Sequence, residues 1–313
     1  MTSRELVRAA IAHRETDRVP YCIGYTADGA AELRRLIGEQ DVEEYTDNDV
    51  VRLGPPWWSW RDLGPDWVGS HTPVSRAQVS GAGSYSEFYD TLKRWRDRTD
   101  KYLLATIYGS HFEKANLARG IENFLADMAA DPVFARGLLT RIIDRNLVML
   151  ENFLACPEVD GVLLGSDWGS QLDLLMSPDT WQEMIRPGEQ KEYDLVHAYG
   201  KDVWIHSCGN VERIIPSLIV MGADVLNPVQ PEAMDLGHLK SVYGSRLTFW
   251  GGISTQETLP YGTPDQVREE SRRVRGLMAR GGGFVFAPAQ EIHGDVPAEN
   301  ILALLEVARE RRR

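Results

Sequence analysis

One triplet, His206-Ser207-Cys208, carries the clearest chemical signal in the sequence. An imidazole and a thiolate two residues apart, on a turn that follows a strand, can both face one point and bind a borderline metal such as zinc. The alternative is a buried free cysteine beside a histidine that is hydrogen-bonded to the backbone, since both are common in protein cores. Two ligands do not complete a metal site, so the triplet alone leaves both interpretations open.

Other polar residues follow the remaining apolar runs of the chain. In parallel α/β folds, such residues meet at the rim where strands end and loops begin. Asp167 is the best carboxylate to act beside the triplet, and its alternative role is to cap the segment that follows it. We expect Gln290 and Glu291 after the last strand to join this rim. We assign substrate binding to Tyr25, Asp28, Tyr108, Asn227 and Trp250.

The elements that must position these residues follow a regular alternation. Short runs rich in β-branched and aromatic residues alternate with longer segments of helical period, most clearly after residue 160. This alternation predicts a parallel sheet covered by helices. The candidate strands are 19–25, 101–110, 160–168, 202–207, 223–230, 247–254 and 283–289, and the candidate helices include 2–14, 30–38, several within 113–155, and one from about 297 onward.

At least seven candidate strands and no credible linker favour one (β/α)8 TIM-type barrel, a single domain over residues 1–313. A doubly wound open sheet is the alternative. Residues 54–100 include an irregular, Trp-rich loop region that we expect over one mouth of the barrel. Glu113, Arg119 and Glu122 share one helical segment, and we favour a solvated helix face for them over a buried charged network.

The balance of charges narrows the functional classes. The chain of 313 residues has 34 Lys and Arg against 46 Asp and Glu, a net charge of −12. Nucleic acid and anionic membrane are therefore poor partners. No apolar stretch approaches the ~20 residues that a membrane helix needs. The three cysteines are widely spaced, which argues against a disulfide scaffold and suits a cytoplasmic protein.

A family likeness is carried by the runs HSCGNVERIIPSLIVMGADVLNPVQ, LTFWGGISTQETLPYGTPDQV and GGGFVFAPAQEIHGDVPAENI. They resemble the uroporphyrinogen decarboxylase superfamily, and more closely its cobalamin-linked branch of the methylcobalamin:coenzyme M methyltransferase type. The runs IYGSHFEKANLARGIENFLADM and GSDWGSQLDLLMSP extend the likeness to nearly the whole chain. The resemblance implies a (β/α)8 barrel and, as is usual for relatives, a homodimer.

The resemblance implies two chemistries on this fold. Members similar to the decarboxylase use an arginine-rich loop after the first strand to hold the many carboxylates of the substrate, and they need no cofactor. Tyr25 and Gly29 stand at the matching positions of this chain. A tetrapyrrole with several carboxylates would meet few compensating cations there, so decarboxylation of uroporphyrinogen itself is disfavoured.

Members similar to the methyltransferases bind zinc through a His-x-Cys pair, matched by His206 and Cys208, and through a further cysteine after the last strand. Gln290 stands at that third position and is a poor zinc ligand. Glu291 would then complete the metal site, with Asp167 or His293 as alternatives.

The expected function is therefore a zinc-dependent methyltransferase in which Asp167, His206 and Gln290 take catalytic roles. It would pass a methyl group between a corrinoid such as methylcobalamin, carried by a partner protein at the barrel mouth, and a small thiol or related acceptor. One alternative is a cofactor-free decarboxylase for a less acidic substrate, with Asp167 or Asp49 stabilising a transient cation and His206 transferring protons. Another is a protein that binds a corrinoid or tetrapyrrole without turnover.

Overall fold

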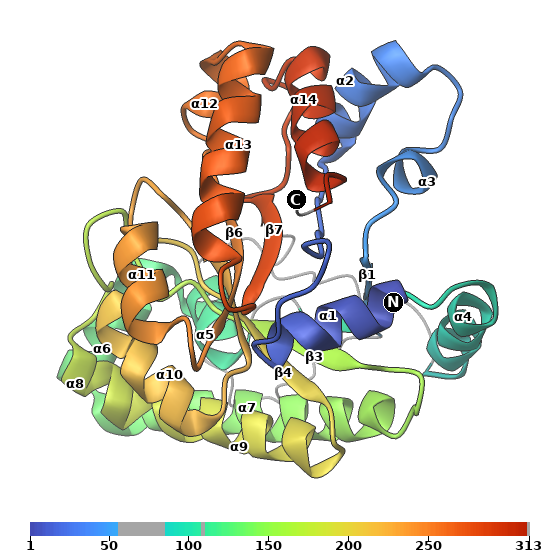
Figure 1. Cartoon of the computed structure of the whole chain (residues 1–313). Helices are drawn as coiled ribbons and strands as arrows, with labels where there is room; N and C mark the ends of the chain where they lie inside the picture. The colour runs from blue at the N-terminus through green and yellow to red at the C-terminus, as the bar shows by residue number, and fades with distance from the viewer. Residues whose placement is uncertain (56–84, 108–109, 312–313) are drawn as a thin grey trace.

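The computed structural model describes residues 1–55, 85–107 and 110–311 (Figure 1). In this part of the chain seven parallel strands form a single curled sheet. Strands that are neighbours in the sequence are neighbours in space, so the order runs from β1 to β7 without reversal. The strand order of a doubly wound sheet does reverse, so that alternative is wrong. The strands are β1 (Val50–Leu53), β2 (Tyr102–Thr106), β3 (Gly161–Gly165), β4 (Asp202–His206), β5 (Val225–Val229), β6 (Thr248–Ile253) and β7 (Phe284–Pro288).

Six of the predicted strands are confirmed as β2 to β7, and the first part of the chain differs from the prediction. β1 was not predicted, and residues 19–25 are not a regular strand. Tyr21 makes an isolated parallel bridge to Phe286 of β7, and its carbonyl accepts a hydrogen bond of 3.0 Å from the backbone N–H of Asp49, directly before β1. This extended segment therefore lies between the two end strands of the sheet.

Helices cover the sheet and follow its strands along the chain. Figure 1 shows α7 and α9 together against one part of the sheet, and α13 and α14 together against another. Ser177 and Thr263 are the N-caps of α8 and α13, since each side chain accepts a hydrogen bond from the first helical turn. No helix in the described ranges is long and apolar enough to cross a membrane. The α-helices are α1 (Ser3–Ile11), α2 (Ala27–Ile37), α3 (Val42–Thr46), α4 (Tyr85–Arg98), α5 (His111–Arg119), α6 (Ile121–Ala130), α7 (Pro132–Leu154), α8 (Pro178–Thr180), α9 (Arg186–Ala198), α10 (Ile215–Met221), α11 (Leu236–Tyr243), α12 (Thr258–Tyr261), α13 (Pro264–Met278) and α14 (Ala298–Ala308).

The strands place an aromatic layer and a polar layer on the same inner face of the sheet. Side chains two residues apart on a strand point to the same face. Trp204 belongs to a buried cluster with Tyr102 and Trp250, and it packs edge-on against Trp250 with ring centroids 5.4 Å apart. His206 is two residues further along β4, so it faces the same interior, above this layer. The aromatic side chains thus form the layer directly below the polar residues at the strand ends.

Candidate functional site

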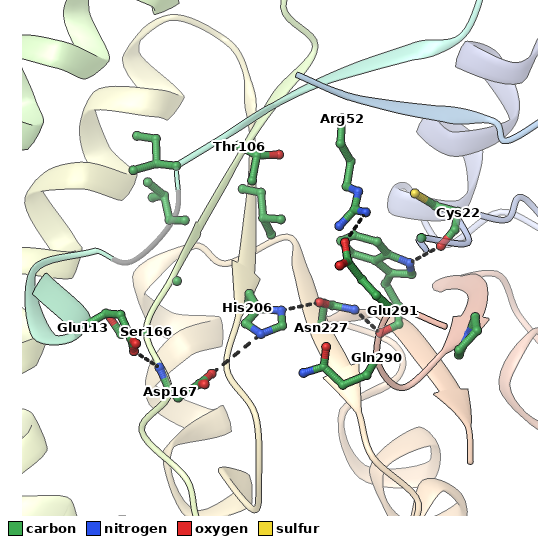
Figure 2. Close-up of a pocket in the computed structure, with 17 residues that line it drawn as sticks. Cys22, Arg52, Thr106, Glu113, Ser166, Asp167, His206, Asn227, Gln290 and Glu291 are labelled. Carbon is green, nitrogen blue, oxygen red and sulfur yellow. Dashed lines mark hydrogen bonds and ion pairs between the residues drawn. The ribbon is translucent and has the colours of Figure 1, made fainter. Parts of the chain in front are cut away.

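A cavity of about 380 Å³ lies above the aromatic layer, at the ends of the strands (Figure 2). Its polar wall combines residues from strands that are far apart in the sequence. The cavity is lined by Cys22, Gly24, Arg52, Thr106, Ile107, Glu113, Leu163, Leu164, Gly165, Ser166, Asp167, His206, Asn227, Trp250, Pro288, Gln290 and Glu291. Six of the predicted site residues therefore share one cavity wall.

The ring of His206 is held in one orientation by Asn227. The amide nitrogen of Asn227 donates to the carbonyl oxygen of Trp250 at 3.1 Å, which leaves its amide oxygen facing the histidine. That oxygen lies 2.6 Å from Nδ1 of His206. Because an amide oxygen only accepts, Nδ1 carries the proton of the neutral ring, and the lone pair of Nε2 is directed at the thiol of Cys208. This arrangement is typical of a histidine that binds a metal through Nε2.

Two further donor atoms face Nε2 of His206. Sγ of Cys208 lies 3.4 Å from it, and Oδ1 of Asp167 lies 3.7 Å from it. Asp167 also accepts a hydrogen bond of 2.8 Å from the backbone N–H of Cys208, which fixes the carboxylate beside the thiol. Burial, followed by the nearby Asp167 carboxylate, raises the pKa of the Cys208 thiol to about 12. The thiol therefore needs a cation beside it to ionise near neutral pH.

The donor set of Asp167, His206 and Cys208 fits a zinc ion. One oxygen, one nitrogen and one sulfur lie within 4.8 Å of one another, and all three residues are half-buried. Three protein ligands and one open position are the composition of catalytic zinc sites. These residues come from the ends of β3 and β4, which pair directly in parallel register.

Gln290, where the sequence resemblance implies a third ligand, contacts the cluster through the sulfur of Cys208. Its amide nitrogen donates to Sγ of Cys208 at 2.8 Å. This hydrogen bond favours the thiolate form of Cys208. Gln290 is therefore placed to support a ligand instead of acting as one.

Glu291 lines the same cavity, but its carboxylate is engaged elsewhere. Oε1 of Glu291 forms an ion pair of 2.7 Å with Nη2 of Arg52 on β1. The geometry therefore favours Asp167 over Glu291 as the third donor to a metal. Arg52 escaped the sequence analysis because β1 has only four residues and carries a charge in its middle.

Glu113 is a second residue whose place the sequence analysis missed. It lines the cavity from the first turn of α5, and its Oε2 accepts a hydrogen bond of 3.3 Å from the backbone N–H of Asp167. Burial, followed by the Asp167 carboxylate, raises the pKa of Glu113. The expectation of a solvated helix face is thus wrong for Glu113, because this end of α5 packs against the strand ends.

Three predicted substrate-binding residues are not among those that line the cavity. The hydroxyl of Tyr25 accepts a hydrogen bond of 3.0 Å from Thr46, and burial raises its pKa to about 12. Asp28 lies at the start of α2, where its carboxylate accepts hydrogen bonds of 3.1 Å from the backbone N–H groups of Gly29 and Gly294. Tyr108 lies outside the described residues. A substrate contact for these three residues stays a prediction.

Asp49, the alternative acid for a decarboxylase, has a structural role in this fold. It is buried beneath β1, and Arg18 donates to both of its oxygens at 2.6 and 2.7 Å. It also accepts a hydrogen bond of 3.0 Å from the backbone N–H of Tyr21. Asp49 therefore holds the segment before β1 in place, and it is not part of the cavity wall in the described structure.

A second group of candidate metal ligands, His111, Glu189 and Glu192, lies in the helical layer between α5 and α9. All three are fully buried, and Nδ1 of His111 lies 3.1 Å from Oε1 of Glu189. The buried Lys114 bonds to the same network through Asn146 at 3.0 Å. Two basic groups thus face two carboxylates, and this balance is that of a buried ion-pair network, with no need of a metal.

Comparisons with known proteins agree with this geometry. Residues 71–311 match the uroporphyrinogen decarboxylase (URO-D) family. A stretch of 131 residues is 32% identical to a methylcobamide:CoM methyltransferase, MtaA, of Methanosarcina barkeri, covering 42% of this chain and 36% of that protein. A stretch of 199 residues is 23% identical to a methylated-thiol–coenzyme M methyltransferase of Methanosarcina mazei, covering 64% of this chain and 51% of that protein. The matches thus span about a third to a half of the length of these relatives.

The fold has a close counterpart among solved structures. A methyltransferase from Methanosarcina mazei superposes with a TM-score of 0.73 at 20% sequence identity, and the match covers 98% of both chains. At this identity the likeness establishes the fold. It supports a TIM-like barrel for the described sheet and its helices.

Proposed function

The chain belongs to the uroporphyrinogen decarboxylase family, and we propose that within this family it is a zinc-dependent methyltransferase. It would pass a methyl group between a corrinoid and a small thiol or related acceptor. The observation that carries the proposal is the cluster of Asp167, His206 and Cys208, in which the unprotonated Nε2 of His206 faces the thiol. The curated relatives, both named as methyltransferases that act with coenzyme M, support the same reaction type.

Each residue of the site has a separate role in the proposed reaction. Bound zinc would act as a Lewis acid that lowers the pKa of an acceptor thiol at its open position. Asn227 keeps Nε2 of His206 available, and Gln290 donates to the sulfur of Cys208. Glu113 holds the loop after β3 against α5 by accepting from the backbone N–H of Asp167, and the Asp167 carboxylate accepts from the backbone N–H of Cys208 after β4.

The proposed reaction is a nucleophilic displacement at carbon. The sulfur of the acceptor forms a bond to the methyl carbon while the bond from that carbon to cobalt breaks, and its electron pair stays on the cobalt. The thiol proton is released to solvent. A cavity of about 380 Å³ suits a small acceptor, so the corrinoid would be presented at the mouth by a partner protein.

We also propose that the sheet closes into a (β/α)8 barrel of one domain, with residues 20–25 in the place of the eighth strand. The hydrogen bonds from this segment to β7 and to Asp49 support that closure. Closure would bring Gly24 beside Arg52 and Glu291 on the wall of the cavity. A cytoplasmic location and a homodimer remain part of the proposal.

The test is the zinc content of the protein purified without chelators or an affinity-tag metal, compared among wild type, Cys208→Ala and Cys156→Ala. We expect about one zinc per chain in wild type and in Cys156→Ala, and none in Cys208→Ala. Cys156 is the matched control because it is a buried thiol bonded to Glu158, outside the cluster of Asp167, His206 and Cys208. Folded wild type that binds no added zinc, or that keeps decarboxylase activity in a chelator, would overturn the proposal.

A further inference from the structure

The loop that follows β7 is held on both sides of Gln290. Before it, the backbone N–H of Ala289 donates to the carbonyl oxygen of Ile253 on β6 at 2.8 Å. After it, the backbone N–H of Ile292 donates to the carbonyl oxygen of Gly24 at 2.9 Å. Two backbone hydrogen bonds thus bracket the residue whose amide contacts the candidate metal cluster.

The far part of this loop packs against the start of α2. The carbonyl oxygen of Ile292 accepts hydrogen bonds of 3.0 Å from both the backbone N–H and the hydroxyl of Thr26. The carboxylate of Asp28 accepts a hydrogen bond of 3.1 Å from the backbone N–H of Gly294. The loop then continues into α14, which packs against α2 (Figure 1). We call the contacts of Thr26, Asp28 and Gly29 with this loop the α2 clasp.

Gly29 brings the two segments closer together than any other residue would allow. A Cβ atom at position 29 would lie 2.0 Å from the carbonyl oxygen of Ile292 and 2.7 Å from its carbonyl carbon. Ordinary contacts between such atoms are about 3.5 Å long, so a side chain here requires the loop backbone to move. A Cβ atom on Gly294 would likewise lie 2.8 Å from Oδ2 of Asp28. Two glycines, one on each segment, therefore set the spacing of the clasp.

We propose that Gly29 and Asp28 are positioning residues for the metal site, and that they act through Gln290. This inference rests on the proposed function, because it needs Cys208 to bind the metal as a thiolate. With the clasp closed, the amide nitrogen of Gln290 lies 2.8 Å from Sγ of Cys208 and donates to it. A loop that moved away from α2 would carry this donor off the sulfur, and metal ligands that lose such support bind more weakly.

The clasp gives the two α2 residues a role outside the cavity. Asp28 is not among the described residues that line the cavity, and its carboxylate accepts from the backbone N–H groups of Gly29 and Gly294. Gly29 stands where the resemblance implies a substrate-binding arginine in decarboxylase-like members. No side chain enters this place unless the loop that carries Gln290 moves. The close approach that positions Gln290 therefore also leaves no room for a cation at position 29.

The test is a double-mutant cycle on zinc affinity, measured by competition with a chromophoric chelator. Gly29→Ala is made alone and together with Gln290→Ala. We expect Gly29→Ala alone to weaken zinc binding by about tenfold, as is typical when the support of a ligand is lost. In the Gln290→Ala background the same substitution should weaken it by less than about twofold, because no amide is left to displace.

Gly137→Ala is the matched control, because on α7 its Cβ would have no described atom within 4 Å. It should leave the zinc affinity unchanged. Asp28→Ala should weaken zinc binding by a smaller factor than Gly29→Ala, and Asp28→Asn, which keeps an acceptor oxygen, should restore most of it. The same cycle with the Asp28 variants decides the matter if Gly29→Ala does not fold.

Hydrogen exchange of the metal-free protein tests the clasp separately. The backbone N–H groups of Ile292 and Gly294 should exchange faster in Gly29→Ala than in Gly137→Ala, because their acceptors on residues 24 and 28 are displaced. Equal exchange in these two variants would overturn the inference.

Equal losses of zinc affinity in the two backgrounds would also overturn the inference, since the clasp would then act on the whole fold and not through Gln290. No loss in Gly29→Ala would do the same while wild type still binds zinc. A wild type that binds no zinc would contradict the proposed function itself, and this inference would fall with it. The two failures are therefore distinguishable.

Discussion

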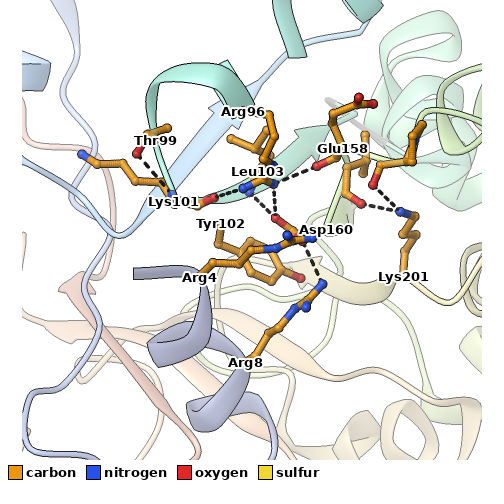
Figure 3. A network of polar contacts seen from close by, with 12 residues as sticks. Arg4, Arg8, Arg96, Thr99, Lys101, Tyr102, Leu103, Glu158, Asp160 and Lys201 are labelled. Atoms are coloured by element: carbon orange, nitrogen blue, oxygen red, sulfur yellow. Dashed lines mark hydrogen bonds and ion pairs between the residues drawn. The ribbon is translucent and has the colours of Figure 1, made fainter. Parts of the chain in front are cut away.

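The charged groups at the start of the strands and those at the carboxyl ends of the strands differ in how fully they are paired. At the end where the strands begin, Asp160 is fully buried and its oxygens accept hydrogen bonds from Arg4, Arg8, Arg96 and the backbone N–H of Leu103, all at 2.6 to 3.0 Å (Figure 3). Helices α1 and α4 supply these arginines, so the carboxylate ties both helices to the base of β2 and β3.

At the other end, the charged and polar groups are left with capacity to spare. Nε2 of His206 faces the thiol of Cys208 and the carboxylate of Asp167, and within the described ranges the guanidinium of Arg52 donates one hydrogen bond, to Glu291. A saturated network stabilises a fold, whereas a group with spare capacity can bind a ligand. The difference shows that stability is concentrated where the strands begin and chemistry where they end, as is general in this architecture.

The largest effect is expected at the saturated end. Asp160→Ala removes the common partner of three partly exposed arginines and leaves the buried N–H of Leu103 without its acceptor, which costs about 3 kcal/mol. Urea unfolding followed by circular dichroism measures this loss. Asp265→Ala is the matched control, because Asp265 pairs with Arg268 on the surface with 96% of its side chain exposed.

That control should change stability by less than about 1 kcal/mol. Zinc bound per folded chain should be the same in both variants as in wild type. Equal stabilities of Asp160→Ala and Asp265→Ala would show that the network at the base of the strands does not hold the fold together.

The next effect concerns the residue that orients His206. Asn227→Ala removes the acceptor for the Nδ1 proton, so the ring loses its fixed tautomer and orientation. Loss of such a support typically weakens metal affinity by about 10- to 100-fold. Competition with a chromophoric zinc chelator measures the affinity, and Asn227→Asp, which keeps an acceptor oxygen, should retain most of it. Unchanged zinc affinity in Asn227→Ala would contradict the assignment of Nε2 as a ligand.

The buried ion-pair network between α5 and α9 gives a pH-dependent prediction. Burial, followed by repulsion from Glu189, raises the pKa of Glu192 from 4.5 to about 7. A raised pKa in the folded state adds stability below the unfolded pKa, and this stability is lost as pH rises through the folded value. Burial lowers the pKa of His111, but the hydrogen bond and the attraction to Glu189 outweigh it and raise the pKa. The raised pKa of His111 also makes the folded protein less stable as pH rises.

Wild type should therefore lose stability relative to Glu192→Gln as pH rises from 5 to 7. Urea unfolding at a series of pH values measures this difference. A difference that stays constant, or that moves in favour of wild type, would show that Glu192 is ionised in the folded protein throughout this range.

The smallest effect is expected at Gly24. In Gly24→Ala the new Cβ would displace the end of the Arg52 side chain, which is flexible, so the fold should lose less than about 1 kcal/mol. Gly54→Ala is the control, because its Cβ would meet open space within the described residues. A loss of stability in urea unfolding well above that of Gly54→Ala would show that the side chain of Arg52 cannot move away from the new Cβ.

Much of the fold could be predicted because strands β2 to β7 are apolar runs bounded by turn signals. β1 could not, since four residues with an arginine among them do not form a recognisable buried run. Residues 19–25 have the composition of a strand, but their hydrogen bonds are shared among two isolated bridges, Asp49 and Asn48. The apolar composition of a segment predicts that it is buried, but it does not predict which backbone groups its N–H and C=O groups bond to.

The candidate site shows the same division. Asp167, His206, Cys208 and Asn227 were predictable, because parallel strands bring the residues at their ends together. The place of Glu113 was not predictable, because α5 buries polar side chains, and a polar helix face is normally expected to be exposed to solvent. The ion pair of Glu291 with Arg52 was hidden as well, since it joins strands at opposite ends of the sequence.

The most direct test of the central claim is zinc K-edge X-ray absorption of the zinc-loaded protein, with and without 3-mercaptopropionate. The account predicts one sulfur ligand at about 2.3 Å, with nitrogen and oxygen completing the shell, and a second sulfur ligand when the thiol is added. A zinc shell without sulfur, or one that gains no sulfur from the thiol, would contradict the account.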